Sequence, residues 1–293
     1  MQTELTIGQT PLLPLLIDGY TIWGKAEFMN PSGSVKDRPI YNILKCAFED
    51  GSLKKGDTII EATSGNAGIS FAMFAAQMGL NCIIVMPSNM SEERKKMLKF
   101  YGAELIEVDA GDFDGAIKLR DELSEKNGWF NGNQFANPKN IEAHYHGTGV
   151  ELMYQCRCEN IKPTAFVAGT GTGGTIMGTG KLLKEQFNEI QLVAVEPEES
   201  PVMSGGQPGL HGIQGIGDGS KFMVDLEVID KIITVSTKDA TDMALRLAKE
   251  FGLFVGISAG ANVLGALRYC EETNNTDVIT ILCDRGERYL SCM

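Results

Sequence analysis

Residues 164–187 read TAFVAGTGTGGTIMGTGKLLKEQF and contain a short apolar strand, a loop of glycines and threonines, and a helical segment. The loop runs from Gly169 to Thr175 and holds four glycines. Glycines let backbone N–H groups approach an anion closely, and the start of the following helix adds a favourable partial charge. This loop is therefore predicted to bind a phosphate group, with its threonines as additional hydroxyl donors.

The same alternation of strand and helix patterns continues on both sides of this loop. Nearly continuous apolar strands are typical of mainly parallel sheets covered by helices on both faces. Two series of such units, before and after about residue 140, predict an α/β protein with two halves whose ligands bind beyond the carboxyl ends of the strands. The expected strands cover residues 58–60, 82–86, 104–108, 164–168, 191–195, 232–235, 254–257 and 278–282. Expected helices cover residues 67–78, 112–126, 238–251 and 259–272. One further helix is expected to begin near residue 91, and another to end at residue 187.

The charge balance of the chain argues against one class of function. The chain has 293 residues with 26 basic and 38 acidic side chains, a formal net charge of −12. This balance opposes binding to nucleic acid, which requires clustered lysine and arginine. The charged run from Glu92 to Lys96 is interpreted as a solvated helix face with compensating charges.

The N-terminus and the cysteines indicate the compartment. Residues 1–19 hold no basic segment of a secretory signal, and the chain contains no apolar run of membrane-spanning length. Seven scattered cysteines are most simply reduced thiols of a cytoplasmic protein. With three histidines and one close pair, Cys156 and Cys158, no metal site is expected.

Two other motifs compete with the phosphate interpretation. Gly169, Gly171 and Gly174 fit G-x-G-x-x-G, and Glu196 follows about 20 residues later, so an NAD-binding oxidoreductase stays open on this loop alone. Residues 256–260 match the G-x-S-x-G nucleophile elbow of α/β-hydrolases. That fold requires a histidine after the serine. The last histidine of this chain is His211, which excludes the hydrolase.

Two further segments carry unusual chemistry. Residues 30–38, NPSGSVKDR, place Lys36 after a Gly/Ser turn at the start of an expected helix. A lysine there opposes the helix dipole, which indicates a role beyond solubility. Residues 63–68, TSGNAG, form a strand-to-helix turn rich in hydroxyl, amide and N–H donors, and such a turn can hold a carboxylate.

Together these segments resemble the cysteine synthase family of pyridoxal 5′-phosphate (PLP) enzymes, which includes cystathionine β-synthases. The likeness runs in order over almost the whole chain. The resemblance implies a tryptophan synthase β-like fold (fold-type II PLP) of two three-layer αβα domains with mainly parallel sheets. A smaller, mobile domain at 36–140 binds the substrate carboxylate, and a larger one, 1–35 plus 141–293, binds the PLP phosphate. Further matching segments are residues 6–12, 133–135, 137–138, 211–217 and 284–291.

The resemblance also implies roles for individual residues. Lys36 forms the Schiff base with PLP and then acts as base on the substrate α-proton, which requires a lowered pKa. Asn66 bonds the ring hydroxyl oxygen and Ser258 faces the pyridine nitrogen. The implied phosphate ligands are Gly171, Thr172, Gly173, Gly174 and Thr175. The substrate-binding residues are Thr63, Ser64, Asn66, Gln134 and Gly215.

The implied activity is β-replacement through an aminoacrylate, because a neutral serine at the ring nitrogen makes a weaker electron sink and favours β-elimination over transamination. The expected reaction is that of cysteine synthase, in which O-acetyl-L-serine and sulfide give L-cysteine and acetate. One alternative consumes cysteine, releases hydrogen sulfide and forms serine or lanthionine. An NAD-binding oxidoreductase and a non-catalytic PLP sensor are the alternatives of other classes.

One long loop is unusual in itself, and two residues depart from the family pattern. Residues 199–223 hold seven glycines and little periodicity, which predicts a functional or mobile loop. Asp218 stands where a small or aromatic residue is expected and is a candidate catalytic residue, whose carboxylate could activate water or a thiol, or repel sulfide. A solvated loop acid is the alternative. Ala67 replaces the threonine of many members.

Cys283 could lie near the cofactor, but it is interpreted as a buried structural cysteine. The resemblance further implies a homodimer, with the C-terminal tail of a serine acetyltransferase as a possible partner.

Overall fold

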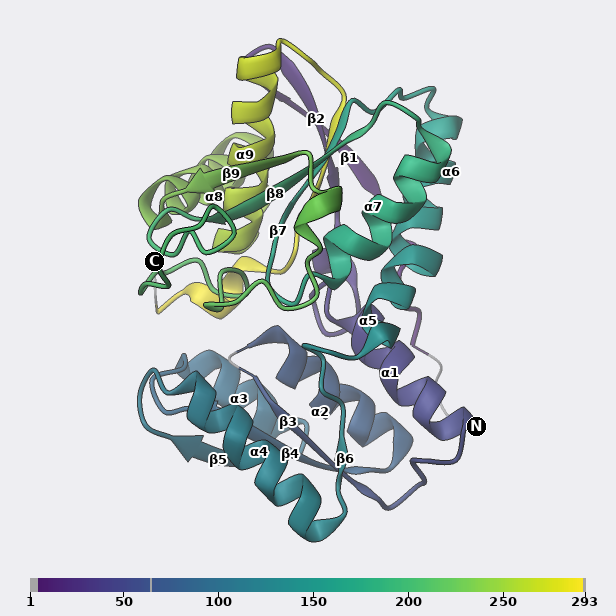
Figure 1. Ribbon diagram of the computed structural model, residues 1–293, viewed down its shortest axis with the longest axis vertical. Coiled ribbons are helices and arrows are strands. Elements are labelled where there is room, and N and C mark those ends of the chain that lie inside the picture. Colours follow the sequence, from purple (N-terminus) through teal and green to yellow (C-terminus); the bar gives the residue numbers. More distant parts are fainter. Residues whose placement is uncertain (1–4, 64, 292–293) are drawn as a thin grey trace.

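The structure is a computed structural model that describes residues 5–63 and 65–291. Two separate β-sheets, each covered by helices on both faces, form the upper and lower parts of the molecule in Figure 1. The chain starts in the larger sheet, builds the smaller one, and returns to complete the larger one.

The larger sheet has six strands in the order β1-β2-β10-β7-β8-β9. Only the first pair, β1 with β2, is antiparallel, and every other pair is parallel. Strand β10, close to the C-terminus, lies between β2 and β7 and joins the N-terminal hairpin to the rest. The strands are β1 (Leu12–Ile17), β2 (Tyr20–Lys25), β7 (Ala165–Gly169), β8 (Gln191–Pro197), β9 (Lys231–Val235) and β10 (Val278–Ile281).

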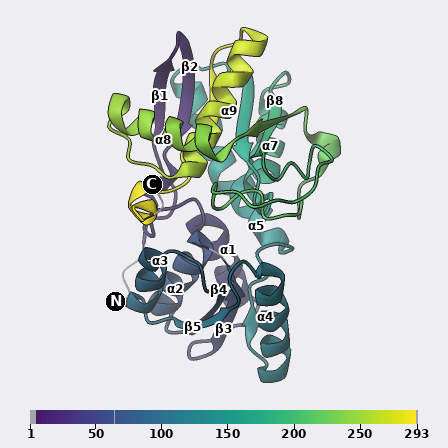
Figure 2. The ribbon, with the colours of Figure 1, turned by 90° about the vertical axis from the view of Figure 1, so that its left-hand side faces the viewer.

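Helices α8 (Thr237–Phe251) and α9 (Ile257–Thr273) cover one face of this sheet, as Figure 2 shows. Helices α6 (Val150–Cys158) and α7 (Gly174–Gln186) pack against the other face. Alternate apolar residues of β7 and β8 point into the two resulting cores, so these strands are buried on both sides.

The smaller sheet has four parallel strands in the order β5-β4-β3-β6. Helices α1, α2 and α3 pack on one face, and α4 packs on the other. The strands are β3 (Thr58–Ala62), β4 (Asn81–Pro87), β5 (Glu104–Val108) and β6 (Phe130–Asn131). The helices are α1 (Asp37–Glu49), α2 (Asn66–Met78), α3 (Glu92–Phe100) and α4 (Phe113–Asn127).

Short helices link the two parts. Helix α5 (Pro138–Ala143) continues directly into the π-helix η2 (His144–Gly149) and then into α6. Helix α5 lies against α1, so the chain enters and leaves the smaller sheet at neighbouring places (Figure 1). Single 3-10 turns occur at η1 (Glu27–Met29), η3 (Leu226–Val228) and η4 (Gly286–Tyr289).

The predicted α/β architecture with two mainly parallel sheets is confirmed, and residues 199–223 are irregular as expected. The strand expected at residues 254–257 is wrong. Val255 makes only an isolated bridge to Arg285, and α9 already begins at Ile257. Val255 and Ile257 are buried in the core, whereas Phe254 is exposed, and both sides of β10 are already paired with other strands. No helix in the described part of the chain is long and apolar enough to span a membrane.

Candidate functional site

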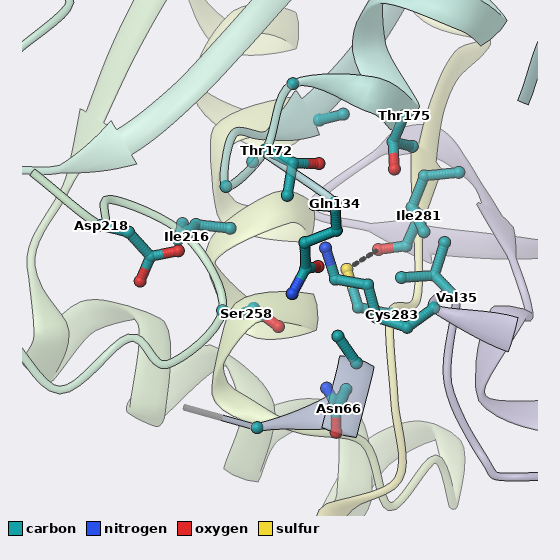
Figure 3. Close-up of a pocket in the computed structure, with 18 of the residues that line it drawn as sticks. Val35, Asn66, Gln134, Thr172, Thr175, Ile216, Asp218, Ser258, Ile281 and Cys283 are labelled. Atoms are coloured by element: carbon teal, nitrogen blue, oxygen red, sulfur yellow. Dashed lines mark hydrogen bonds between the residues drawn. The ribbon is translucent and has the colours of Figure 1, made fainter. Parts of the chain in front are cut away.

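A pocket lies between the two sheets and is lined by segments from both (Figure 3). Its walls come from turns that follow β3 and β7, at the carboxyl ends of parallel strands, where ligands of α/β folds bind. The pocket brings together most of the predicted site residues, namely Lys36, Thr63, Asn66, Gln134, Gly171, Thr172, Gly173, Thr175, Gly215, Asp218 and Ser258. Gly174 lies behind the lining as the first residue of α7, and Ser64 lies outside the described residues.

Lys36 is the residue immediately before α1, and its side chain faces the pocket. The turn that carries it is fixed by the buried carboxylate of Asp37, which accepts hydrogen bonds from the Ser32 amide at 2.7 Å and the Ser70 hydroxyl at 2.6 Å. Burial lowers the pKa of Lys36, while the negative charge of Asp218 opposes this effect. A lowered pKa increases the neutral fraction of an amine, which is the form that attacks a carbonyl.

The loop from Gly171 to Thr175 forms a cradle at the start of α7. A side chain at Gly171 would place its Cβ 2.5 Å from the carbonyl oxygen of Gly215, and Gly173 has a φ of +89°. The first N–H groups of α7 have no partner within the helix. The N–H of Gly174 donates to the Thr172 hydroxyl at 3.3 Å, and the N–H groups that follow it are available to an anion. In Figure 3, Thr172 and Thr175 lie together at the same end of the pocket.

Asn66 begins α2 and lies at the opposite end of the pocket from the cradle in Figure 3. Its amide nitrogen donates to Asp284 at 2.6 Å, and Arg288 donates to its amide oxygen. Thr63 precedes it at the end of β3 and accepts a hydrogen bond from the Gly65 amide at 3.2 Å. The start of α2 therefore presents its free N–H groups and two oriented side chains to the pocket.

Gln134 is buried and lines the pocket, and a buried ion pair holds its backbone. Its backbone amide donates to the carboxylate of Glu61 at 3.2 Å, and Glu61 in turn pairs with Arg120 at 2.7 Å. Sequence reasoning did not identify either charged residue, because the pairing depends on tertiary packing.

Ser258, in the first turn of α9, lines the pocket together with Cys283. Burial raises the pKa of the Cys283 thiol to about 12, although a hydrogen bond from Ser258 opposes this effect. Cys283 therefore stays a neutral thiol at ordinary pH. Cys283 is half-buried and forms part of the pocket wall, so it lies next to the expected cofactor site.

Asp218 lines the pocket on the side of the loop that carries Gly215 and Ile216 (Figure 3). A Cβ at Gly171 would lie 3.7 Å from its carboxylate, which places Asp218 beside the cradle. Burial raises the pKa of Asp218, and the positive charges of Lys36 and His211 oppose this effect. Asp218 thus lines the same pocket as the amine of Lys36.

Glu196 is not positioned as the ribose-binding residue of a dinucleotide site would be. Its side chain is 2 % exposed and accepts hydrogen bonds from the Met203 and Ser204 amides at 2.7 and 2.9 Å and from the Ser204 hydroxyl at 2.5 Å. Both carboxylate oxygens therefore bond to the loop at 199–223, and the buried side chain is not accessible to a ribose.

Arg94 is a pocket residue that sequence reasoning missed. The expected solvated face of α3 is wrong here, because Arg94 is 1 % and Lys95 9 % exposed. The Arg94 guanidinium lies 5.0 Å from the centre of the Tyr289 ring, and it donates to Gln214. Lys95 donates to the Ser88 carbonyl at 2.7 Å. The one available signal was the match around residue 289, which indicated that the C-terminal segment belongs to the site.

These features fit pyridoxal 5′-phosphate. The three glycines of the cradle leave no room for side chains, so a phosphate would meet backbone N–H groups there. A lysine with a lowered pKa faces the same pocket. A hydroxyl at Ser258 and an amide at Asn66 supply neutral polar partners for a heteroaromatic ring. The fold and the site therefore define a PLP-dependent enzyme.

Comparison with known proteins leads to the same class. The family described as pyridoxal-phosphate dependent enzyme matches residues 3–284, and the chain belongs to this family. A cysteine synthase of Staphylococcus aureus is 44% identical over 292 residues, covering 97% of this chain and 94% of the relative.

Two solved structures are also similar. O-ureido-L-serine synthase has a TM-score of 0.93 and 39% identity, with coverage of 98% of this chain and 92% of that chain. A hydrogen sulfide-producing enzyme from Fusobacterium nucleatum has a TM-score of 0.93 and 40% identity, with coverage of 98% and 88%. The predicted fold-type II architecture and the PLP cofactor are thereby confirmed.

Proposed function

We propose that this enzyme catalyses β-replacement on an amino acid, converting O-acetyl-L-serine and sulfide into L-cysteine and acetate. The observation that carries the proposal is the position of Lys36 in one pocket with the Gly171–Thr175 cradle and the turn at Asn66. A relative that is 44% identical over almost the whole chain is a cysteine synthase, which supports this choice of reaction.

The residues of the pocket divide into those that hold the cofactor and those that hold the substrate. PLP, when bound, withdraws electrons from the α-carbon of an amino acid. Gly171, Thr172, Gly173, Gly174 and Thr175 would hold its phosphate through backbone N–H groups and hydroxyls. Asn66 would bond the ring hydroxyl, and Ser258 would meet the ring nitrogen as a neutral partner.

On the substrate side, Thr63, Asn66 and Gln134 would hold the carboxylate, with Ser64 and Gly215 also assigned to this subsite. Anchoring the carboxylate fixes the direction of the bond between the α-carbon and its proton. Lys36 would then remove that proton, because burial lowers the pKa of its amine and leaves a larger neutral fraction. Departure of acetate and addition of sulfide at the β-carbon complete the exchange.

The proposal extends to motion and assembly. We expect residues 36–140 to move as the smaller, carboxylate-binding domain against residues 1–35 and 141–293. The family resemblance supports a homodimer in the cytoplasm and a site that could accept the C-terminal tail of a serine acetyltransferase.

Product analysis with the holoenzyme tests the reaction. Incubation with O-acetyl-L-serine and sulfide should give equal amounts of cysteine and acetate, and omission of sulfide should abolish cysteine formation. Borohydride treatment should attach a pyridoxyl group to the peptide that contains Lys36, and Lys36→Ala should prevent this. If O-acetyl-L-serine yields no cysteine, the assignment fails.

Asp218 favours a second candidate, in which the enzyme consumes cysteine, releases hydrogen sulfide and forms serine or lanthionine. A carboxylate that faces the pocket beside Lys36 can accept a proton from water or from a second thiol before it adds to the β-carbon. The resemblance to a hydrogen sulfide-producing enzyme from Fusobacterium nucleatum supports this candidate. Incubation with L-cysteine alone separates the two, because only the second candidate produces sulfide with serine or lanthionine.

A further inference from the structure

Asn140 lies in α5, behind the phosphate cradle, and its side chain is 1 % exposed. Its amide nitrogen donates two hydrogen bonds, one to the backbone carbonyl of Gln134 at 2.9 Å and one to the Thr172 hydroxyl at 3.0 Å. One buried side chain therefore connects the loop assigned to the substrate carboxylate with the cradle assigned to the cofactor phosphate.

The orientation of this amide follows from its partners. The Gln134 carbonyl can only accept a hydrogen bond, so the NH2 group of Asn140 and not its oxygen must face it. The same NH2 group has its second hydrogen directed at Thr172. The arrangement uses both donors of the amide at once, which leaves the side chain a single stable orientation.

This orientation determines what the Thr172 hydroxyl can do. The hydroxyl oxygen accepts from Asn140 at 3.0 Å and from the Gly174 amide at 3.3 Å. A hydroxyl has two acceptor positions and one hydrogen to donate. With both acceptor positions filled from behind, its hydrogen is directed to the pocket, where a phosphate oxygen would accept it.

Gly174 shows how closely the parts fit. A Cβ at Gly174 would lie 1.9 Å from the amide oxygen of Asn140, so only glycine permits Asn140 to occupy this place. Helix α7, which begins in the cradle, and helix α5, which carries Asn140, are therefore in direct contact at this point.

We propose that Asn140 is a positioning residue that couples cofactor binding to substrate binding. It sets the Thr172 hydroxyl as a donor toward phosphate and fixes the backbone of Gln134 toward the carboxylate. The inference rests on the proposed function, since that function assigns these two groups to cofactor and substrate.

Cofactor affinity tests the first half, by titration of apoenzyme with pyridoxal 5′-phosphate and measurement of its dissociation constant. Asn140→Ala should weaken binding about tenfold, the effect of losing one oriented hydrogen bond in a buried site. Thr172→Val should do the same. The double variant should bind within about twofold of Thr172→Val alone, because Asn140 acts on the cofactor through that hydroxyl.

Asn140→Asp keeps the shape of the side chain in case the alanine variant does not fold. It removes both donor hydrogens and adds a negative charge near the phosphate, so its cofactor affinity should fall further than that of Asn140→Ala. Far-UV circular dichroism of each variant confirms that the fold is retained.

Substrate binding tests the second half. L-alanine carries the carboxylate but no β-leaving group, and its binding to each holoenzyme at saturating cofactor can be followed by absorption. Asn140→Ala should weaken L-alanine binding about tenfold, because the Gln134 loop loses its support. Thr172→Val keeps the hydrogen bond from Asn140 to the Gln134 carbonyl and should weaken L-alanine binding less than Asn140→Ala does.

Asn137→Asp is the matched control. Asn137 donates to the Gly132 carbonyl of the same loop at 3.0 Å, and its oxygen caps α5. The aspartate variant keeps the cap and should leave cofactor affinity unchanged. Effects of Asn140→Ala and Thr172→Val that multiply in the double variant, or an equal loss of affinity in Asn137→Asp, would overturn the coupling. Failure of the wild-type protein to bind PLP would instead refute the proposed function.

Discussion

Glu61 on β3 and Arg120 on α4 form a buried ion pair, with 2.7 Å between Oε1 and Nη1 and side chains that are 1 % and 4 % exposed. The second oxygen of Glu61 accepts from the backbone amide of Gln134. The ion pair therefore holds the backbone of Gln134, a pocket residue, from the core of the smaller sheet. Removal of two charges from water is costly, and it is offset here by several hydrogen bonds to the same carboxylate.

Arg120→Met should lower the free energy of unfolding by about 3–5 kcal/mol, because it leaves the carboxylate of Glu61 buried without its cation. Urea denaturation measures this change. Arg120→Lys keeps a positive charge and should lose less. A loss below about 1 kcal/mol for the methionine variant would show that the pair does not stabilise the fold.

Glu151 predicts how stability depends on pH. Burial raises its pKa, but hydrogen bonds and charges from Arg38 and Lys25 outweigh this effect and lower the pKa to about 2. The folded pKa is thus below the unfolded value of 4.5, so this stability is present above pH 4.5 and is lost as pH falls toward 2. A shift of this size corresponds to roughly 3 kcal/mol.

Glu151→Gln should therefore flatten the loss of unfolding free energy between pH 5 and 2, as measured by urea denaturation at several pH values. Glu250→Gln is the control, since Glu250 pairs with Arg246 at the surface and is 51 % exposed. Equal slopes in wild type and Glu151→Gln would contradict the prediction.

Features encoded in a short stretch of sequence were predicted, whereas features that depend on residues far apart in the chain were not. The cradle and the turn at Asn66 were predicted, because a run of glycines or donors between a strand and a helix has a local meaning. The burial of Arg94 was not, because its charged neighbours indicate a surface helix and its partner Tyr289 is far away in the chain. The strand expected at 254–257 failed for a related reason, since apolar content reports burial and not pairing.

Glu196 anchors the irregular loop at 199–223 through three hydrogen bonds. Glu196→Gln replaces one acceptor oxygen with an NH2 group that would face other donors, so the loop should open more often. Limited proteolysis with mass spectrometry should show cleavage between residues 199 and 223 about tenfold faster. Glu198→Gln, at an exposed neighbouring position, should be cleaved at the wild-type rate, and a similar acceleration there would refute the anchor.

Asp218 predicts the pH profile of cysteine consumption. Burial raises the pKa of Asp218 above the usual 3.8, and only the ionised carboxylate can accept a proton. Sulfide release from L-cysteine should therefore increase with pH through this raised pKa. Asp218→Asn should slow the release about 100-fold and flatten that acid limb, while Asp218→Glu should keep the limb. An unchanged profile in Asp218→Asn would exclude Asp218 as the base.

The position of β10 has a consequence for folding during synthesis on the ribosome. Residues 278–281 pair with β2 on one side and with β7 on the other. During synthesis the edge of β2 that pairs with β10 stays unpaired until residues 278–281 emerge, whereas the smaller sheet is complete once residue 131 is made. The smaller sheet can thus fold first, and the nascent hairpin is the segment that a chaperone would have most reason to shield.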